Sequence, residues 1–211
     1  MFITFEGPEG SGKTTQLQRT GAWLRERGVD CVLTKEPGGT PLADRIRAIL
    51  LHPESEMDPL TELLLYAASR RQHVVEVIRP ALQRGAVVLC DRFTDATLAY
   101  QGFGRLLDLD RLRMLNAWVT DSLVPAATLL FDIDERVGLE RAHARNTTSS
   151  NNEGRFEAED LRFHRRVREG YLSLAKAEPE RFVLIEAAGT VDEVAGRTRA
   201  ELTARLPELS R

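Results

Sequence analysis

The chain has no long hydrophobic run, little net charge and few cysteines. No apolar stretch approaches the roughly 20 residues that span a bilayer, and a strand-like pattern begins at Phe2, so we expect neither a membrane segment nor a signal peptide. Its 29 basic and 32 acidic residues leave a net charge of −3, which gives no electrostatic reason to expect nucleic acid or a membrane as partner. Cys31 and Cys90 each lie in an apolar run, and we expect both to be buried and reduced in a cytoplasmic protein.

The sequence also lacks internal repeats and any Pro/Gly/Ser-rich linker. Its 211 residues can bury a substantial core, so we predict a single domain over residues 1–211. Apolar β-rich runs alternate with helical patterns, which indicates an α/β fold with a mostly parallel sheet. The predicted strands are Phe2–Glu6, Val29–Thr34, Ala86–Cys90, Ala127–Asp132 and Arg181–Glu186. The predicted helices are 13–28, 41–51, 60–84, 95–101, 108–122, 135–145, 157–177 and 191–206.

A phosphate-binding loop is present between the first strand and the first helix. Gly7–Thr14 reads G-x-x-x-x-G-K-T, and in this context backbone N–H groups and the helix N-terminus can surround a polyphosphate. Lys13 would reach the outer phosphates, and the Thr14 hydroxyl could bind Mg²⁺. The predicted nucleoside triphosphate site consists of Gly7, Pro8, Glu9, Gly10, Ser11, Gly12, Lys13, Thr14 and Thr15.

Two motifs that accompany such loops in other proteins are absent. The chain has neither the N-K-x-D motif of switch GTPases nor an L-S-G-G-Q-like transporter signature. Asp91 and Arg92 instead follow a predicted buried strand, at the sheet edge where α/β proteins bind ligands. Asp91 could hold a Mg²⁺–phosphate assembly through water, and the Arg92 fork suits a phosphate; a local surface ion pair would also explain both residues.

The segment 146–152 is wholly polar and has no helical or strand period. Arg141, Arg145 and Arg155 border it. The residues alone leave two interpretations open, a solvated surface loop or a lid that folds arginines over a phosphate. A lid arginine would suit phosphoryl transfer, which needs in-line geometry and positive charge around the transferred group.

Four segments resemble the bacterial thymidylate kinase (dTMP kinase) family of phosphate-loop nucleoside monophosphate kinases. They are EGPEGSGKTT at 6–15, TKEPGGT at 34–40, YAASRRQ at 66–72 and DRFTDATLAYQGFGR at 91–105. The resemblance implies a P-loop NTPase fold, with a five-stranded parallel sheet ordered 2-3-1-4-5, flanking helices and a short lid at about 141–157. It also implies transfer of the γ-phosphoryl of ATP to dTMP, with Mg²⁺, giving dTDP and ADP for dTTP synthesis, and a homodimeric enzyme.

The same resemblance implies residue roles. Glu9 would approach the 3′-hydroxyl of dTMP, Tyr66 would stack on thymine, and Arg70 would hydrogen-bond an exocyclic oxygen of the base. The implied dTMP site consists of Glu9, Glu36, Pro37, Arg47, Tyr66, Arg70, Arg92, Thr97, Tyr100 and Gln101, with Arg47 and Arg92 on the monophosphate and Tyr100 near the sugar. The implied catalytic residues are Lys13, Asp91, Arg92, Arg145 and Arg155, with Thr14 and Asp91 at the metal.

The sequence departs from the family pattern at two places. Lys35 stands where many relatives have arginine; lysine keeps the positive charge but lacks the planar guanidinium that donates two parallel hydrogen bonds. The lid is the second departure: it keeps the R-x-x-x-R pattern of relatives at 141–145, but a polar insert follows, and GRFE at 154–157 replaces their D-R-x-E. In the family the transition-state arginine comes from the phosphate loop or from the lid. This loop carries no arginine between Gly7 and Gly12, so the lid is expected to supply it, from Arg145 or Arg155. The alternative functions are a kinase for another nucleotide or deoxynucleoside and, more remotely, a phosphate-loop regulatory ATPase.

Overall fold

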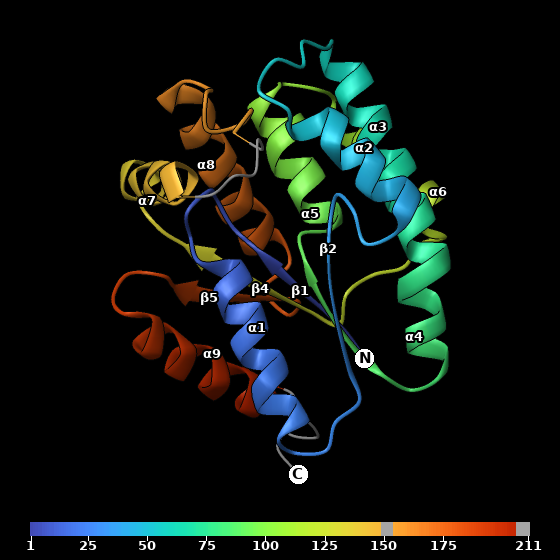
Figure 1. Cartoon of the computed structure of the whole chain (residues 1–211), viewed down its shortest axis with the longest axis vertical. Helices are drawn as coiled ribbons and strands as arrows, with labels where there is room; N and C mark the ends of the chain where they lie inside the picture. The colour runs from blue at the N-terminus through green and yellow to red at the C-terminus, as the bar shows by residue number, and fades with distance from the viewer. Residues whose placement is uncertain (149–153, 206–211) are drawn as a thin grey trace.

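A computed structural model describes residues 1–148 and 154–205 of the chain. Five strands form one parallel sheet in the order β2-β3-β1-β4-β5, which confirms the predicted fold class and strand order. The strands are β1 (Phe2–Glu6), β2 (Cys31–Lys35), β3 (Val87–Asp91), β4 (Ala127–Asp132) and β5 (Phe182–Glu186) (Figure 1). Part of the polar segment 146–152 and the predicted helix end at residue 206 lie outside the described residues.

Two strands end later than predicted. β2 ends at Lys35 and β3 at Asp91, which are paired in the sheet register. The prediction that Asp91 follows its strand is therefore wrong by one residue. An apolar pattern marks only the buried part of a strand, whereas backbone pairing with Lys35 and Phe5 extends β3 to the polar residue.

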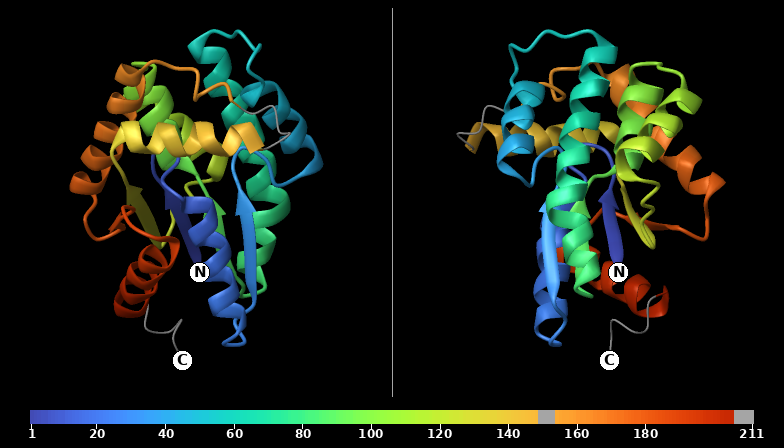
Figure 2. Two further views of the ribbon diagram at one scale, coloured as in Figure 1. Left: turned by 60° about the vertical axis from the view of Figure 1, so that its left-hand side comes forward. Right: turned by 90° about the vertical axis from the view of Figure 1, so that its right-hand side faces the viewer.

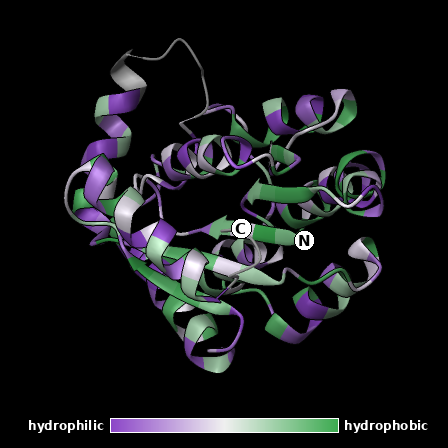
Figure 3. Ribbon diagram, turned by 90° about the horizontal axis from the view of Figure 1, so that it is seen from below, coloured by the Kyte–Doolittle hydropathy of each residue, from purple (hydrophilic) through white to green (hydrophobic). Residues whose placement is uncertain are grey.

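Helices cover both faces of the sheet because successive strand side chains point to opposite sides. Ile3, Phe5 and Leu24 belong to one core cluster, which α1 (Lys13–Arg25) and α9 (Val191–Arg205) share. Phe2 and Val88 belong to another cluster on the opposite face. Figure 3 shows this division, with mostly hydrophobic strands inside and hydrophilic patches on the surrounding helices.

The long helix predicted at 60–84 is continuous but not uniform. It comprises α3 (Pro59–His73), a π-helical segment (Val74–Ile78) and α4 (Arg79–Gln83). The helix predicted at 95–101 likewise consists of α5 (Thr94–Thr97) and a π-helical segment, Leu98–Gly104.

The helix predicted from Glu157 begins later, as α8 (Leu161–Ala177). Its start is fixed by Asp160, whose side chain accepts a hydrogen bond of 2.7 Å from the Phe163 N–H and caps the helix. The remaining helices are α2 (Pro41–Leu51), α6 (Leu109–Thr120) and α7 (Glu135–Thr148).

The carboxyl ends of the strands all meet one edge of the sheet. α7 lies across this edge in the left view of Figure 2. The phosphate loop touches α7 closely, because a Cβ on Gly10 would lie 1.9 Å from the Gly138 carbonyl oxygen. Within the described residues, no helix is both long and apolar enough to cross a membrane.

Candidate active site

A cavity of about 440 Å³ opens at the carboxyl edge of the sheet. Its wall includes most of the residues that the sequence singled out: Glu9, Gly10, Gly12, Lys13, Thr14, Thr15, Glu36, Pro37, Arg47, Tyr66, Arg70, Asp91, Arg92, Thr97, Tyr100, Gln101 and Arg145. The predicted residues Gly7, Pro8, Ser11 and Arg155 are not in this wall. One continuous cavity therefore joins the phosphate loop to the pocket expected for the second substrate.

The phosphate loop places Lys13 inside the protein. The ammonium lies 3.4 Å from the Pro8 carbonyl oxygen, and the side chain lines the cavity. Burial and the nearby Arg92 guanidinium lower the pKa of Lys13, whereas the Glu9 carboxylate opposes this shift. The loop thus brings a positive group to where phosphates would bind.

Thr14, in the first turn of α1, meets Asp91, the last residue of β3. The Thr14 hydroxyl donates to Oδ2 of Asp91. Oδ1 of Asp91 is buried and accepts no hydrogen bond from any residue that the structure describes. A hydroxyl and a carboxylate oxygen without a donor are the hard oxygen ligands that Mg²⁺ prefers, so these residues fit the predicted metal.

Arg92 is the centre of a mostly buried polar cluster. Its guanidinium donates to Glu9 Oε1 at 2.6 Å, to the Tyr100 hydroxyl at 2.9 Å and to the Tyr171 hydroxyl at 3.1 Å. Burial raises the pKa of Glu9, but the charges of Arg92 and Lys13 outweigh it and bring that pKa to about 2. Glu9 is therefore an anion held beside the Arg92 cation in the cavity wall.

The pocket beyond Arg92 is built from aromatic and amide side chains. Tyr66 and Phe156 both line it, with ring centroids 6.5 Å apart. Arg70 is 2% exposed and donates to the Thr97 hydroxyl at 2.8 Å. Gln101 lines the same wall and is 1% exposed. A flat ring could stack in this pocket while its edge meets polar groups.

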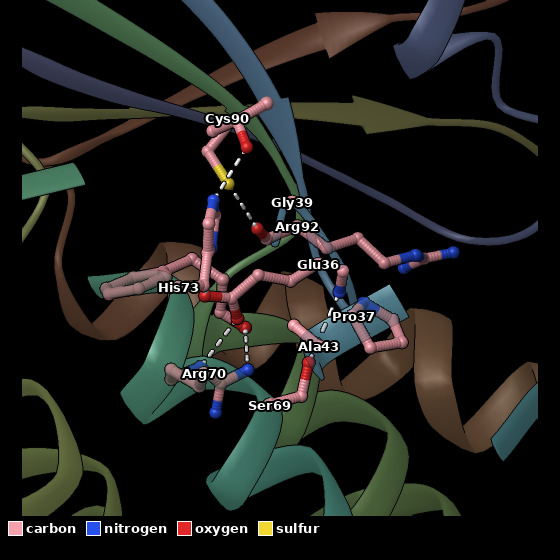
Figure 4. Close-up of polar contacts among 12 residues, drawn as sticks. Glu36, Pro37, Gly39, Ala43, Ser69, Arg70, His73, Cys90 and Arg92 are labelled. Carbon is pink, nitrogen blue, oxygen red and sulfur yellow. Dashed lines mark hydrogen bonds and ion pairs between the residues drawn. The ribbon is translucent and has the colours of Figure 1, made fainter. Parts of the chain in front are cut away.

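Glu36 holds Arg70 in place (Figure 4). Its carboxylate accepts from Arg70 Nε at 2.7 Å and lies 3.0 Å from Nδ1 of His73. The turn that follows needs glycine, because Gly39 has φ 89° and a Cβ there would lie 2.7 Å from the His73 ring. The E-P-G-G-T segment therefore packs closely against α3 and fixes the cavity wall.

The two candidate lid arginines occupy different surroundings. Arg145 lines the cavity, is 56% exposed in its side chain and donates to Glu157 at 3.1 Å. Arg155 is 10% exposed in its side chain and points to the α2–α3 region, where it pairs with Glu62 at 2.7 Å and donates to the Ser55 carbonyl at 3.0 Å. Of the two arginines, only Arg145 lines the cavity.

Several residues in or behind the site were not predicted from the sequence. Glu6 accepts from the Phe93 N–H and the Tyr171 hydroxyl, both at 2.7 Å, and burial together with the Asp95 charge raises its pKa to about 8. The cavity wall also includes Lys35, Leu51, Ala96, Phe156 and Glu157. Phe156 carried a signal, since it is an aromatic residue beside a wholly polar segment.

A phosphate loop that shares one cavity with an arginine- and aromatic-lined pocket defines a P-loop kinase of a small acceptor. The sequence model of the Thymidylate kinase family matches residues 5–197. The chain is 57% identical over 208 residues to a thymidylate kinase of Geobacter sulfurreducens, covering 98% of each chain. It is 52% identical to a thymidylate kinase of Deinococcus radiodurans over 97% of each chain.

A solved structure agrees with these comparisons. The crystal structure of thymidylate kinase from Ehrlichia chaffeensis matches with a TM-score of 0.77 and 36% identity, over 96% of this chain and 98% of that one. The chain therefore belongs to the thymidylate kinase family.

Proposed function

We propose that the chain transfers the γ-phosphoryl of ATP to dTMP, giving dTDP and ADP for dTTP synthesis. The observation that carries this proposal is the single cavity in which Lys13 of the phosphate loop and the Tyr66–Arg70 pocket face the same space. Family membership over nearly the whole chain supports the same activity.

On the donor side, Gly7–Thr15 would surround the ATP phosphates. Lys13 would neutralise the outer phosphates, and Thr14 and Asp91 would hold Mg²⁺. The metal would supply positive charge to the phosphate oxygens. The chain itself would orient the γ-phosphoryl group through the loop backbone and the buried ammonium.

On the acceptor side, the cluster around Arg92 would position the monophosphate and the sugar. Arg92 would bind the phosphate with Arg47, and Glu9 would accept from the 3′-hydroxyl. Tyr100 contacts Glu9 at 2.9 Å and would crowd a 2′-hydroxyl. Tyr66 would stack on the base, while Arg70, Thr97 and Gln101 would meet its edge, and Glu36 and Pro37 would support the wall.

The activity is tested by a coupled ADP-release assay with a panel of nucleoside monophosphates at fixed ATP. We expect ADP formation to depend on dTMP and to be faster with it than with dCMP or dGMP. Equal rates across the panel would favour a kinase for another nucleotide. Slow ATP hydrolysis at the same rate with and without each nucleoside monophosphate would favour a regulatory ATPase.

Arg145 is proposed as the lid arginine that stabilises the transition state. We expect Arg145→Ala to lower kcat by about 10²-fold or more, with little change in the KM for dTMP, because the guanidinium would stabilise charge in the transition state and not in the bound substrate. Arg155→Ala should lower the melting temperature instead, because it removes a partner of the buried Glu62 carboxylate. Steady-state kinetics and thermal unfolding of both variants check this. A larger loss of kcat in Arg155→Ala, at unchanged stability, would reverse the assignment.

We further propose a homodimer, formed through α2, α3 and α6. These helices pack side by side and expose apolar side chains at helical spacing, namely Leu42, Ile49, Leu60, Leu64, Met114 and Trp118, each at least 50% exposed. Patches of this kind mark interfaces between proteins. A sedimentation measurement that gives only the mass of one chain, 23.7 kDa, would exclude the dimer.

The same proposal treats residues 1–211 as one kinase domain in the cytoplasm. That compartment holds ATP and keeps thiols reduced. Cys31 and Cys90 are both buried and free, as the sequence predicted.

A further inference from the structure

Glu62 is a fully buried carboxylate to which neither the sequence motifs nor the proposed mechanism gives a role. It lies on α3 one turn before Tyr66, behind the cavity wall. Its Oε1 accepts from Gln101 Nε2 at 2.8 Å. Arg155 and Arg105 occupy Oε2, at 2.7 and 3.2 Å. Both oxygens of the carboxylate are therefore engaged by N–H donors.

This contact determines which way the Gln101 amide faces. A carboxylate oxygen paired with guanidinium groups only accepts hydrogen bonds, so Gln101 must turn its NH₂ group toward Glu62. Arg105 is itself held by Glu159 at 2.6 Å and lies 4.7 Å above the Phe163 ring. Arg105 and Arg155 thus hold the Glu62 carboxylate on the side away from the cavity. If the Gln101 amide flipped, the buried Glu62 carboxylate would lose one hydrogen-bond donor.

The other end of the amide is available to a ligand. Gln101 lines the cavity, and no described residue donates to its Oε1. Arg70 stands nearby and donates to Glu36, Thr97, Asn116 and the Phe93 carbonyl. These four bonds leave one N–H of Nη2 for an acceptor outside the described network. Arg70 lines the same cavity as Gln101, so a ligand there could meet an acceptor from Gln101 and the remaining donor of Arg70.

Thymine and uracil match a wall with an acceptor from Gln101 beside a donor from Arg70, and cytosine does not. Thymine carries an N3–H donor beside its O4 acceptor, whereas cytosine has an acceptor at N3 and a donor amine at C4. We propose that Glu62 is a positioning residue that sets base specificity, by holding the Gln101 amide so that the site accepts a pyrimidine with an N3–H group and rejects cytosine. The proposal rests on the dTMP kinase function proposed above.

The test is Glu62→Gln, which keeps the shape and lets the residue act as donor or acceptor. We expect the ratio of kcat/KM for dTMP to that for dCMP to fall by at least about tenfold. The change should come from a higher KM for dTMP, with kcat for dTMP within about threefold of wild type. The matched control is Glu159→Gln, which breaks the other ion pair of Arg105 but leaves Arg155 bound to Glu62, and it should leave the ratio unchanged. An unchanged ratio in Glu62→Gln would overturn the proposal.

A double-mutant cycle with Gln101→Ala separates positioning from a general structural effect. In the Gln101→Ala background, Glu62→Gln should no longer change the dTMP/dCMP ratio. An equal fall in both backgrounds would show that Glu62 acts by some other route.

If Glu62→Gln does not fold, a change of ligand tests whether Gln101 recognises the N3–H group of the base. We expect 3-methyl-dTMP, which lacks the N3–H, to bind at least about tenfold more weakly than dTMP, and this penalty to shrink in Gln101→Ala, where the methyl group has room. Equal binding of the two ligands to wild type would overturn the proposal. If wild type shows no preference for dTMP over dCMP, the proposed function fails; a preference that survives Glu62→Gln overturns only the role of Glu62.

Discussion

Lys13→Ala is expected to lower kcat by at least about 10³-fold, because preorganised positive charge is the main contribution a protein makes to phosphoryl transfer. The Lys13 ammonium lies within the cavity wall, 3.4 Å from the Pro8 carbonyl oxygen. Its position is set by the first turn of α1, so a neighbouring side chain cannot replace it. ADP release at saturating ATP and dTMP measures the effect.

The control for Lys13 is Lys176→Ala, which removes an exposed lysine from α8. We expect wild-type turnover in that variant. The dTMP affinity of Lys13→Ala should also stay close to wild type, because Tyr66 and Arg70, which would bind the base, lie on α3 and not on the loop. Turnover of Lys13→Ala within tenfold of wild type would remove Lys13 from the catalytic residues.

Arg92→Ala is expected to lower kcat by a similar factor, at least about 10³-fold. The change removes the guanidinium that contacts Glu9 at 2.6 Å and Tyr100 at 2.9 Å. The Glu9 carboxylate would lose the main charge that brings its pKa to about 2. The variant thus loses both a phosphate ligand and the order of the groups around the sugar. Single-turnover kinetics at saturating dTMP measure the loss.

The backbone at Arg92 provides a matched control. Arg92 has φ 69°, a left-handed conformation that glycine adopts without cost and that costs alanine about 1 kcal/mol. Arg92→Gly should therefore be as inactive as Arg92→Ala and unfold at a higher temperature. If Arg92→Gly kept activity that Arg92→Ala lost, the backbone conformation rather than the guanidinium would be the essential feature.

Most of the fold could be predicted because its signals are local. Each strand is a short apolar run, and Pro41 and Pro59 mark helix starts that the structure confirms. The errors lie at element ends and within helices. The π-helical segment Val74–Ile78 continues a helical pattern with the same apolar side chains, so its altered hydrogen bonding leaves no mark in the sequence.

The candidate site was predictable where a motif fixes residue types at fixed spacing. Most of the phosphate loop and the Asp91–Arg92 pair do line one cavity. The partners of these residues were not predictable, because they come from distant elements. Tyr171, which contacts Arg92, is 79 residues away from it in the chain. Glu62 resembles any helix-surface glutamate in the sequence, yet Gln101, Arg105 and Arg155 converge on it in the fold.

The sequence by itself determined the α/β fold, the phosphate loop and the family, since these depend on residue types at short spacing. The tertiary structure alone decided between Arg145 and Arg155 as the arginine that faces the cavity. It also decided the direction of the Gln101 amide. Both outcomes depend on which donors and acceptors share a buried space, and long-range packing brings those groups together.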